Sequence, residues 1–147
     1  MRNDEIARAV LDQNSYVVLA TSDVSGKPWA TPVWYAHAEY RQLIWVSAPD
    51  AKHSLNLALR PEVAMVVYDS TVTPGEGQAV YMTGTAGPAD ISLLEVFSRR
   101  ALRSGLGEWS PRRVSGKARL RLYRAEVHEW SILDPDADIE VRVRVEP

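Results

Sequence analysis

Hydrophobic and polar residues alternate over several short stretches of this chain, a pattern typical of half-buried β-strands. The strongest of these stretches are rich in Val, Ile, Thr and aromatic residues and cover residues 16–22, 28–37, 43–48, 62–70 and 78–86. Two further strands are expected within residues 117–133, and residues 138–145 alternate like a final edge strand. Gly and Pro lie between many of these segments, so the pattern predicts strands joined by short turns.

Three segments with helical periodicity interrupt the strands, at residues 4–14, 51–60 and 90–104. Asp50 stands where it could cap the second helix, and Pro61 closes that helix. A short link at residues 39–41 indicates a hairpin, and no glycine-rich nucleotide loop is present. The sequence therefore predicts a mainly β protein, a small closed or partly closed antiparallel barrel with inserted helices, rather than a doubly wound sheet.

The composition is that of one globular domain. The chain has 147 residues, of which 46% are hydrophobic and 24% charged, and its net charge is −2. We expect a single domain over residues 1–147 with a helical insertion at about residues 88–116. The N-terminus lacks the features of a signal peptide and no apolar run reaches the ~20 residues of a membrane helix, so we expect a cytoplasmic protein without a membrane partner.

Side chains that could carry catalysis are sparse. Cysteine is absent, which excludes disulfides, thiolate metal ligands and cysteine nucleophiles. His37, His53 and His128 are far apart in sequence and show no metal-ligand spacing, so we expect no metal site and assign no catalytic residue. The basic stretch from Arg99 to Arg124 is interpreted as solvated surface without a nucleic-acid partner, because no nucleic-acid motif accompanies it. Any redox chemistry would belong to a cofactor.

The first local feature that points to a ligand is the run Asp50-Ala51-Lys52-His53. Basic side chains in the first turn of a helix oppose the helix dipole, and a bound anion would remove this mismatch. Ser47, at the end of the preceding strand, could add a hydroxyl donor. The alternative interpretation is that Lys52 is solvated and that Asp50 compensates its charge.

The second local feature is the run Thr31-Pro32-Val33-Trp34. Proline removes a hydrogen-bond donor from a strand, which indicates a sheet edge, a bulge or a barrel rim. Backbone groups left unpaired there could serve a planar heterocycle, with Trp29 and Trp34 as apolar walls. The alternative is an aromatic-rich strand in the core.

In order and spacing, these segments resemble the FMN-binding split barrels of the pyridoxamine-phosphate-oxidase-like family. The resemblance runs through YVVLAT (16–21), GKPWATPVWY (26–35), LIWVS (43–47), KHSLNLALRP (52–61), VAMVVYD (63–69) and VYMTGTA (80–86). It implies a six-stranded antiparallel split β-barrel that forms a homodimer, with FMN at the subunit interface. It also implies a flavin-dependent oxidoreductase that acts on a small molecule, whose identity the sequence does not indicate.

The resemblance also implies which residues surround the cofactor. These residues are Thr31, Pro32, Val33, Trp34, Ser47, Ala48, Lys52, His53, Gln78 and Trp130. The first four would line the flavin ring and the next four would hold the phosphate. Gln78 would reach the flavin from the partner subunit, and Trp130 would pack near it. Trp34, Tyr81 and Trp109 are further expected to line a substrate pocket.

Two departures from the family pattern limit these expectations. Thr31 stands where many members have an arginine that binds the phosphate, and the chain end VRVRVEP lacks the Arg-x-His motif of true pyridoxamine-phosphate oxidases. We therefore do not expect oxidation of vitamin B6. An F420-dependent reductase and a non-catalytic flavin- or heme-binding module remain alternatives. If His53 were half charged, phosphate affinity would fall as the pH rises.

Overall fold

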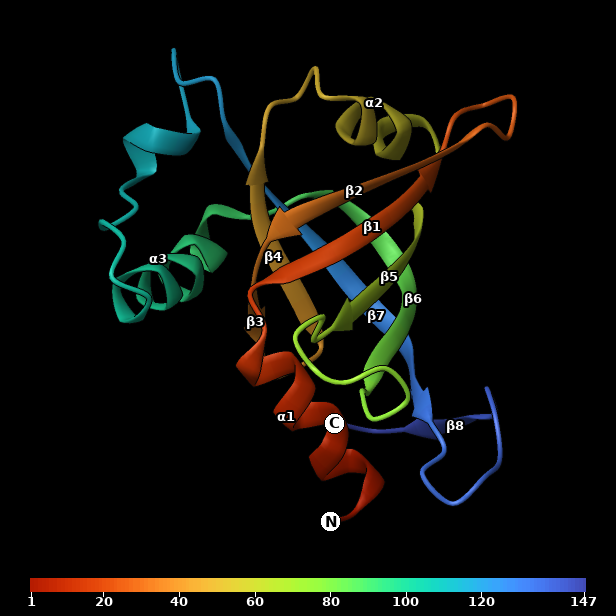
Figure 1. The fold of residues 1–147 in the computed structure, drawn as a ribbon. Helices are drawn as coiled ribbons and strands as arrows, with labels where there is room; N and C mark the ends of the chain where they lie inside the picture. The colour runs from red at the N-terminus through yellow and green to blue at the C-terminus, as the bar shows by residue number, and fades with distance from the viewer.

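A computed structural model describes all residues from 1 to 147 as one strongly curled antiparallel sheet flanked by helices (Figure 1). The strand order is β2-β1-β5-β6-β7-β4-β3, and β8 pairs with the end of β7. The strands are β1 (Tyr16–Ser22), β2 (Pro28–Trp34), β3 (Ala36–Ala38), β4 (Gln42–Ser47), β5 (Glu62–Tyr68), β6 (Ala79–Pro88), β7 (Arg121–Leu133) and β8 (Arg142–Val145). The prediction of a mainly β, split-barrel architecture is confirmed.

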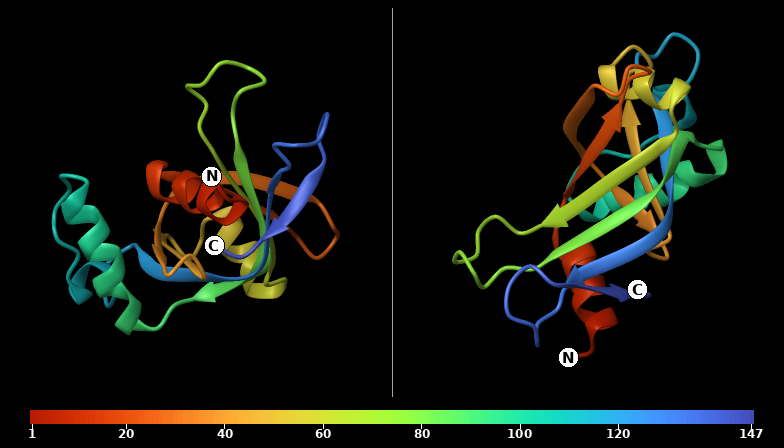
Figure 2. Two further views of the ribbon diagram at one scale, coloured as in Figure 1. Left: turned by 90° about the horizontal axis from the view of Figure 1, so that it is seen from below. Right: turned by 90° about the vertical axis from the view of Figure 1, so that its right-hand side faces the viewer.

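The helices are placed around the rim and one side of the curl. They are α1 (Asn3–Gln13), α2 (Lys52–Leu59) and α3 (Leu94–Arg103), with short 3₁₀ turns η1 (Ile91–Leu93) and η2 (Pro111–Val114). Helices α1 and α2 lie at opposite ends of the curled sheet, and α3 lies to one side of it (Figures 1 and 2). Helix α2 contacts β1, β2 and β6, so it covers the end at which β4 finishes.

The main hydrophobic core fills the inside of the curl. Alternating residues of each strand point inward, as in β5, where Val63, Met65 and Val67 are buried. Burying a side chain of this size stabilises the fold by about 1.5–3 kcal/mol. A second, smaller cluster packs α3 against the outside of β3 and β4 around Phe97, whose ring meets Trp34 and Trp109 edge to face.

Three expected strand boundaries differ in the structure. The segment at 28–37 is divided into β2 and β3 at Tyr35, whose N–H donates to Ser15 O and whose hydroxyl donates to Leu11 O. The segment at 117–133 contains the single strand β7 (Arg121–Leu133) rather than two strands, and the final strand is shorter than expected. The alternating pattern predicted eight strands and the structure has eight, because the division of 28–37 offsets the single strand within 117–133; the family resemblance had implied six.

A bulge interrupts the pairing of β6 with β7 near the middle of both strands. Thr83 of β6 pairs with Glu129, whereas the next residue, Gly84, pairs with Val127, so that His128 is the extra residue of the bulge. The two backbones approach so closely here that a Cβ atom on Gly84 would collide with the carbonyl group of Glu126. Glycine is therefore required at this point of β6 by the neighbouring backbone.

We predict that Gly84→Ala lowers the free energy of unfolding by about 2–3 kcal/mol, because neither backbone can move without breaking ladder hydrogen bonds. Gly87→Ala in the same strand is the matched control, since a Cβ atom there meets nothing within 4 Å. Urea denaturation of both variants measures the difference. Equal stabilities of the two variants would contradict the assigned bulge.

Candidate functional site

The first candidate site is the connection between the end of β4 at Ser47 and the start of α2 at Lys52. It is called the anion corner below. The N-cap of α2 is Ala51, which offers no side-chain hydrogen bond, and the first turn contains no acid. The backbone N–H groups of Lys52, His53 and Ser54 consequently have no acceptor within the protein. Such a helix end carries partial positive charge and attracts anions.

Ser47 and His53 meet inside this corner. Ser47 Oγ lies 2.7 Å from His53 Nε2, and both side chains are buried. Burial disfavours the charged imidazolium and lowers the pKa of His53 below its usual 6.5. This shift favours a neutral, hydrogen-bonding His53 over the half-charged imidazole considered from the sequence.

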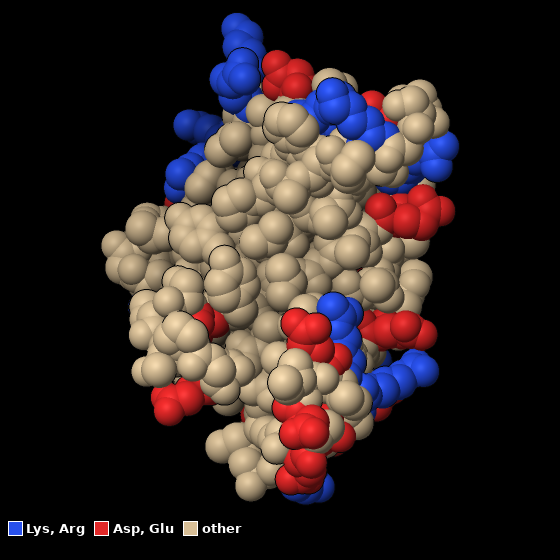
Figure 3. Space-filling view, turned by 45° about the vertical axis from the view of Figure 1, so that its right-hand side comes forward, with Lys and Arg blue, Asp and Glu red and all other residues tan.

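Asp50 does not cap α2 as the sequence suggested. Its carboxylate instead lies 3.5 Å from the guanidinium of Arg119, and both side chains are about three-quarters exposed. Ala51 takes the cap position because the turn that precedes the helix is closed by its N–H donating to Ala48 O. The pairing brings Arg119, which the sequence placed in a solvated stretch, beside the anion corner. Basic side chains gather at this end of the molecule (Figure 3).

The proline-bearing strand β2 lies beside the same corner. It pairs only with β1, which confirms the predicted sheet edge, and it contacts both β4 and α2. Pro32 is exposed, Thr31 is half-buried and Val33 points into the main core. Trp34 points to the other face and packs against Phe97 and the guanidinium of Arg100. The elements that carry Thr31–Trp34, Ser47, Ala48, Lys52 and His53 are therefore neighbours.

Gln78 and Trp130 lie away from the anion corner within one chain. The Gln78 amide donates to Leu133 O at 2.6 Å and accepts from Leu133 N at 3.2 Å, which holds β6 to β7. Trp130 is buried, pairs with Val145 of β8 and donates to Tyr40 O at 3.1 Å. Figure 1 places β8 and the β3–β4 turn at the end opposite α2.

The second candidate site is a groove of about 430 Å³ on the outer face of β1, β5, β6, β7 and β8, called the sheet groove below. One cross-strand row of its floor consists of Val18, Val66, Tyr81 and Ser131. The next row consists of Ala20, Ala64, Thr83 and Glu129. Small side chains in these rows create the hollow, and a broad face without charged side chains occupies this side of the molecule (Figure 3).

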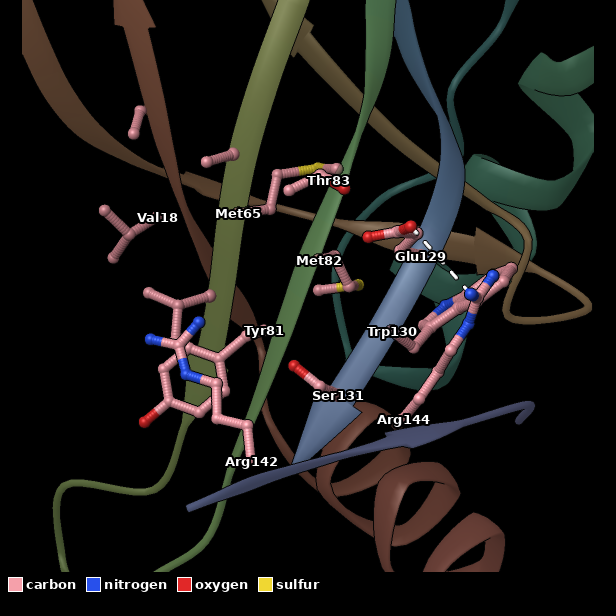
Figure 4. Close-up of a pocket in the computed structure, with 13 residues that line it drawn as sticks. Val18, Met65, Tyr81, Met82, Thr83, Glu129, Trp130, Ser131, Arg142 and Arg144 are labelled. Carbon is pink, nitrogen blue, oxygen red and sulfur yellow. Dashed lines mark ion pairs between the residues drawn. The ribbon is translucent and has the colours of Figure 1, made fainter. Parts of the chain in front are cut away.

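The sheet groove contains residues that the sequence reading did not connect with a site. Arg142 and Arg144 from β8 line it together with Tyr81 (Figure 4). The alternation of residues 141–145 (VRVRV) is the signal that could have placed both arginines on one face. Of the three aromatic residues expected around a substrate pocket, only Tyr81 lies here, since Trp34 and Trp109 pack against Phe97.

Other polar clusters serve the fold. His37 Nε2 lies 2.7 Å from Asp12 Oδ1, and the His37 ring stacks on Tyr40 at the β3–β4 turn. No group of three or more His, Asp or Glu side chains is placed to hold a metal ion. None of the helices combines the length and apolarity needed to cross a membrane.

Comparisons with known proteins agree with this architecture. A heme binding protein from Mycobacterium smegmatis superimposes with a TM-score of 0.71 at 18% identity, over 99% of this chain and 58% of that one. The heme storage protein HutZ from Vibrio cholerae gives a TM-score of 0.66 at 15% identity, over 87% of this chain and 92% of that one. An F420 reductase gives 0.63 at 20% identity, over 85% and 95% of the two chains. These likenesses show the fold alone.

A search of curated proteins gives no match. The family described as Pyridoxamine 5'-phosphate oxidase matches residues 4–134, which include the anion corner, β2 and most of the sheet groove. β8, with Arg142 and Arg144, lies beyond the matched residues. On the basis of this match over nearly the whole chain, and of the split-barrel fold, the protein belongs to the pyridoxamine 5'-phosphate oxidase family.

Proposed function

We propose that this protein is an FMN-binding oxidoreductase that binds the cofactor phosphate in the anion corner and the flavin ring along β2. The observation that carries this proposal is the start of α2, where three backbone N–H groups lack an acceptor beside Lys52. An uncapped helix end without acids is a poor arrangement for the free protein and a good one for a bound dianion.

The side chains of the anion corner fit a phosphate group. Lys52 supplies a mobile positive charge, and Ser47 supplies a hydroxyl group that the neutral His53 holds in place at 2.7 Å. Arg119 adds a second cation near the corner through its pairing with Asp50. Many family members have a phosphate-binding arginine at the position of Thr31, and Arg119 could supply the missing positive charge. Charge-assisted hydrogen bonds of this kind are about twice as strong as neutral ones.

The edge of β2 fits the flavin ring. Because β2 pairs only with β1, the backbone groups of its outer edge have no strand partner. The rim of a flavin ring presents donors and acceptors that such groups can satisfy. When bound, FMN accepts and releases electrons, and the role of this chain is to orient the ring and to limit the access of water.

A second copy of the chain would complete the site. Gln78 lies away from the anion corner and would reach a flavin only from another subunit, whereas the buried Trp130 would support that end of the sheet from within the core. Two large side chains are exposed on the outer face of the sheet, Tyr16 at 58% and Tyr68 at 51%. An exposed apolar face of this kind supports assembly into a homodimer.

F420 and heme are the other cofactors to be considered, because relatives of similar fold are named as an F420 reductase and as heme-binding proteins. The basic end of the molecule could receive the acidic tail of F420 (Figure 3). No histidine lines the sheet groove, so that groove offers no imidazole ligand to a heme iron. We therefore place FMN first and F420 second.

The purified protein is to be titrated separately with FMN, F420 and hemin, and binding followed by absorption spectra. We expect saturable binding of FMN at lower concentration than of either alternative, in a dimer by analytical ultracentrifugation. Preference for F420 would transfer the phosphate assignment to that cofactor. If the protein binds neither FMN nor F420, an oxidoreductase function for this site is refuted.

We predict that Lys52→Ala combined with Ser47→Ala weakens FMN binding at least tenfold, equivalent to about 1.4 kcal/mol, because both donors to the phosphate are lost. Arg103→Ala, which removes a cation from an exposed position on α3, is the control for net charge and should leave the affinity unchanged. Dissociation constants from flavin fluorescence quenching measure both effects. An unchanged affinity in the double variant would place the phosphate elsewhere.

The lowered pKa of His53 predicts a specific dependence of stability on pH. Below about pH 6.5 the unfolded chain binds a proton at this residue while the folded protein does not, so the free energy of unfolding falls as the pH decreases. The loss ends once the pH passes the folded-state pKa of His53. Urea denaturation between pH 8 and pH 4 should show that the free energy of unfolding falls less steeply in His53→Gln than in the unchanged protein. Parallel curves for the two proteins would mean that His53 titrates normally.

A further inference from the structure

The sheet groove combines an apolar floor with cationic side chains at one rim. Val18, Val66 and Ala64 contribute apolar atoms to the floor, and the charged residues that line the groove are Arg142, Arg144 and Glu129. These three side chains carry one net positive charge. We propose that the two β8 arginines make the sheet groove a binding site for a planar apolar compound that bears an anionic group.

Arg142 is the principal anion-binding group of this proposal. Its guanidinium lies 3.6 Å from the centroid of the Tyr81 ring, and no carboxylate pairs with it. Stacking on an aromatic face uses the flat side of the guanidinium and leaves its N–H edge available for a carboxylate, sulfonate or phosphate oxygen. Figure 4 shows Arg142 lying against Tyr81.

Arg144 plays a lesser part because an acid already opposes it. Its guanidinium lies 3.9 Å from Glu129, in a pair whose side chains are both about two-thirds exposed. An exposed pair at this distance is weak, yet it offsets the positive charge of Arg144. The unpaired cation of the groove is therefore Arg142, and the two arginines should contribute unequally.

Strand pairing sets the position of both arginines. Arg144 stands opposite Ser131 and Arg142 stands opposite Leu133, while the intervening Val143 turns inward. The row of Tyr81 and Ser131 therefore continues directly into Arg144. A flat ligand lying on Val18 and Val66, beside the stacked Arg142 and Tyr81, would point its anionic edge toward β8.

The proposal deepens the function proposed above and rests on it in one respect. If two subunits place the sheet groove of one beside the flavin of the other, the ligand of the groove is the substrate. The substrate class would then be aromatic or polyene anions rather than neutral compounds. Binding to the groove itself requires no flavin, which allows the two proposals to fail separately.

The test uses anilinonaphthalene sulfonate as the anionic probe and phenylnaphthylamine as a neutral probe with the same ring system. Fluorescence titration of the folded full-length protein gives both affinities. We expect Arg142→Gln to weaken binding of the sulfonate roughly fivefold or more, with little change for the neutral amine. Arg144→Gln should have a smaller effect. Added salt should weaken sulfonate binding to the unchanged protein more than to Arg142→Gln.

Arg99→Gln is the matched control, because it removes the same charge from α3, away from the groove. Thermal denaturation checks that each variant is folded, and Arg142→Lys tests whether the stacked guanidinium matters beyond its charge. Equal effects of Arg142→Gln and Arg99→Gln would overturn the proposal, as would equal losses for both probes. If binding of the sulfonate depends on Arg142 but FMN does not bind, the groove is supported as a ligand site and the proposed flavin function is refuted.

Discussion

The antiparallel pairing of β4 with β7 is the constraint on which the rest of the structure depends. Six consecutive residue pairs, from Gln42–Glu126 to Ser47–Arg121, connect segments that are far apart in sequence. This pairing turns the sheet back on itself, so that β2 comes to contact β4 across the remaining gap. Without it, Ser47 and the edge of β2 would not share one corner. The ligand site proposed here is therefore a consequence of how the curl is completed.

A polar layer under α2 connects this corner to the core. Ser47 meets His53, and Asn56 donates from its amide to the hydroxyl of Thr21 on β1. Buried polar groups are costly when they lack partners, so these contacts also fix the position of the helix on the sheet. Burial in this layer lowers the pKa of His53, so in the proposed site the charge of a phosphate would be met by Lys52 and the helix dipole. Under that proposal, folding and ligand binding depend on the same few residues.

The two faces of the sheet are used for different purposes. Large side chains fill the inside of the curl, whereas small side chains such as Ala20 and Ala64 leave the outside hollow. β7 pairs with β6 along most of its length, while β4 pairs with residues 121–126 and β8 with residues 130–133. Because β8 lies beyond the part of the chain that matches the family, its arginines add a property to the groove that the matched residues do not specify.

The sequence by itself determined most of the fold, because alternation and turn residues are local properties. It located five early strands, three helices and the edge character of β2, and its resemblance indicated the family and the split barrel. It also selected Lys52 and His53 as neighbours of a helix start, since that feature spans only a few residues. Its expectations for Asp50 and for the segment at 117–133 were wrong.

Only the tertiary structure decided which distant residues meet. Arg119 reaches Asp50, and Arg142 reaches Tyr81, through strand pairings that no local pattern encodes. The charge state of His53 likewise depends on burial by the whole fold. Local backbone preferences are visible in the sequence. Burial and long-range contacts arise only in the folded sheet, because the register of its strands determines which side chains lie next to one another.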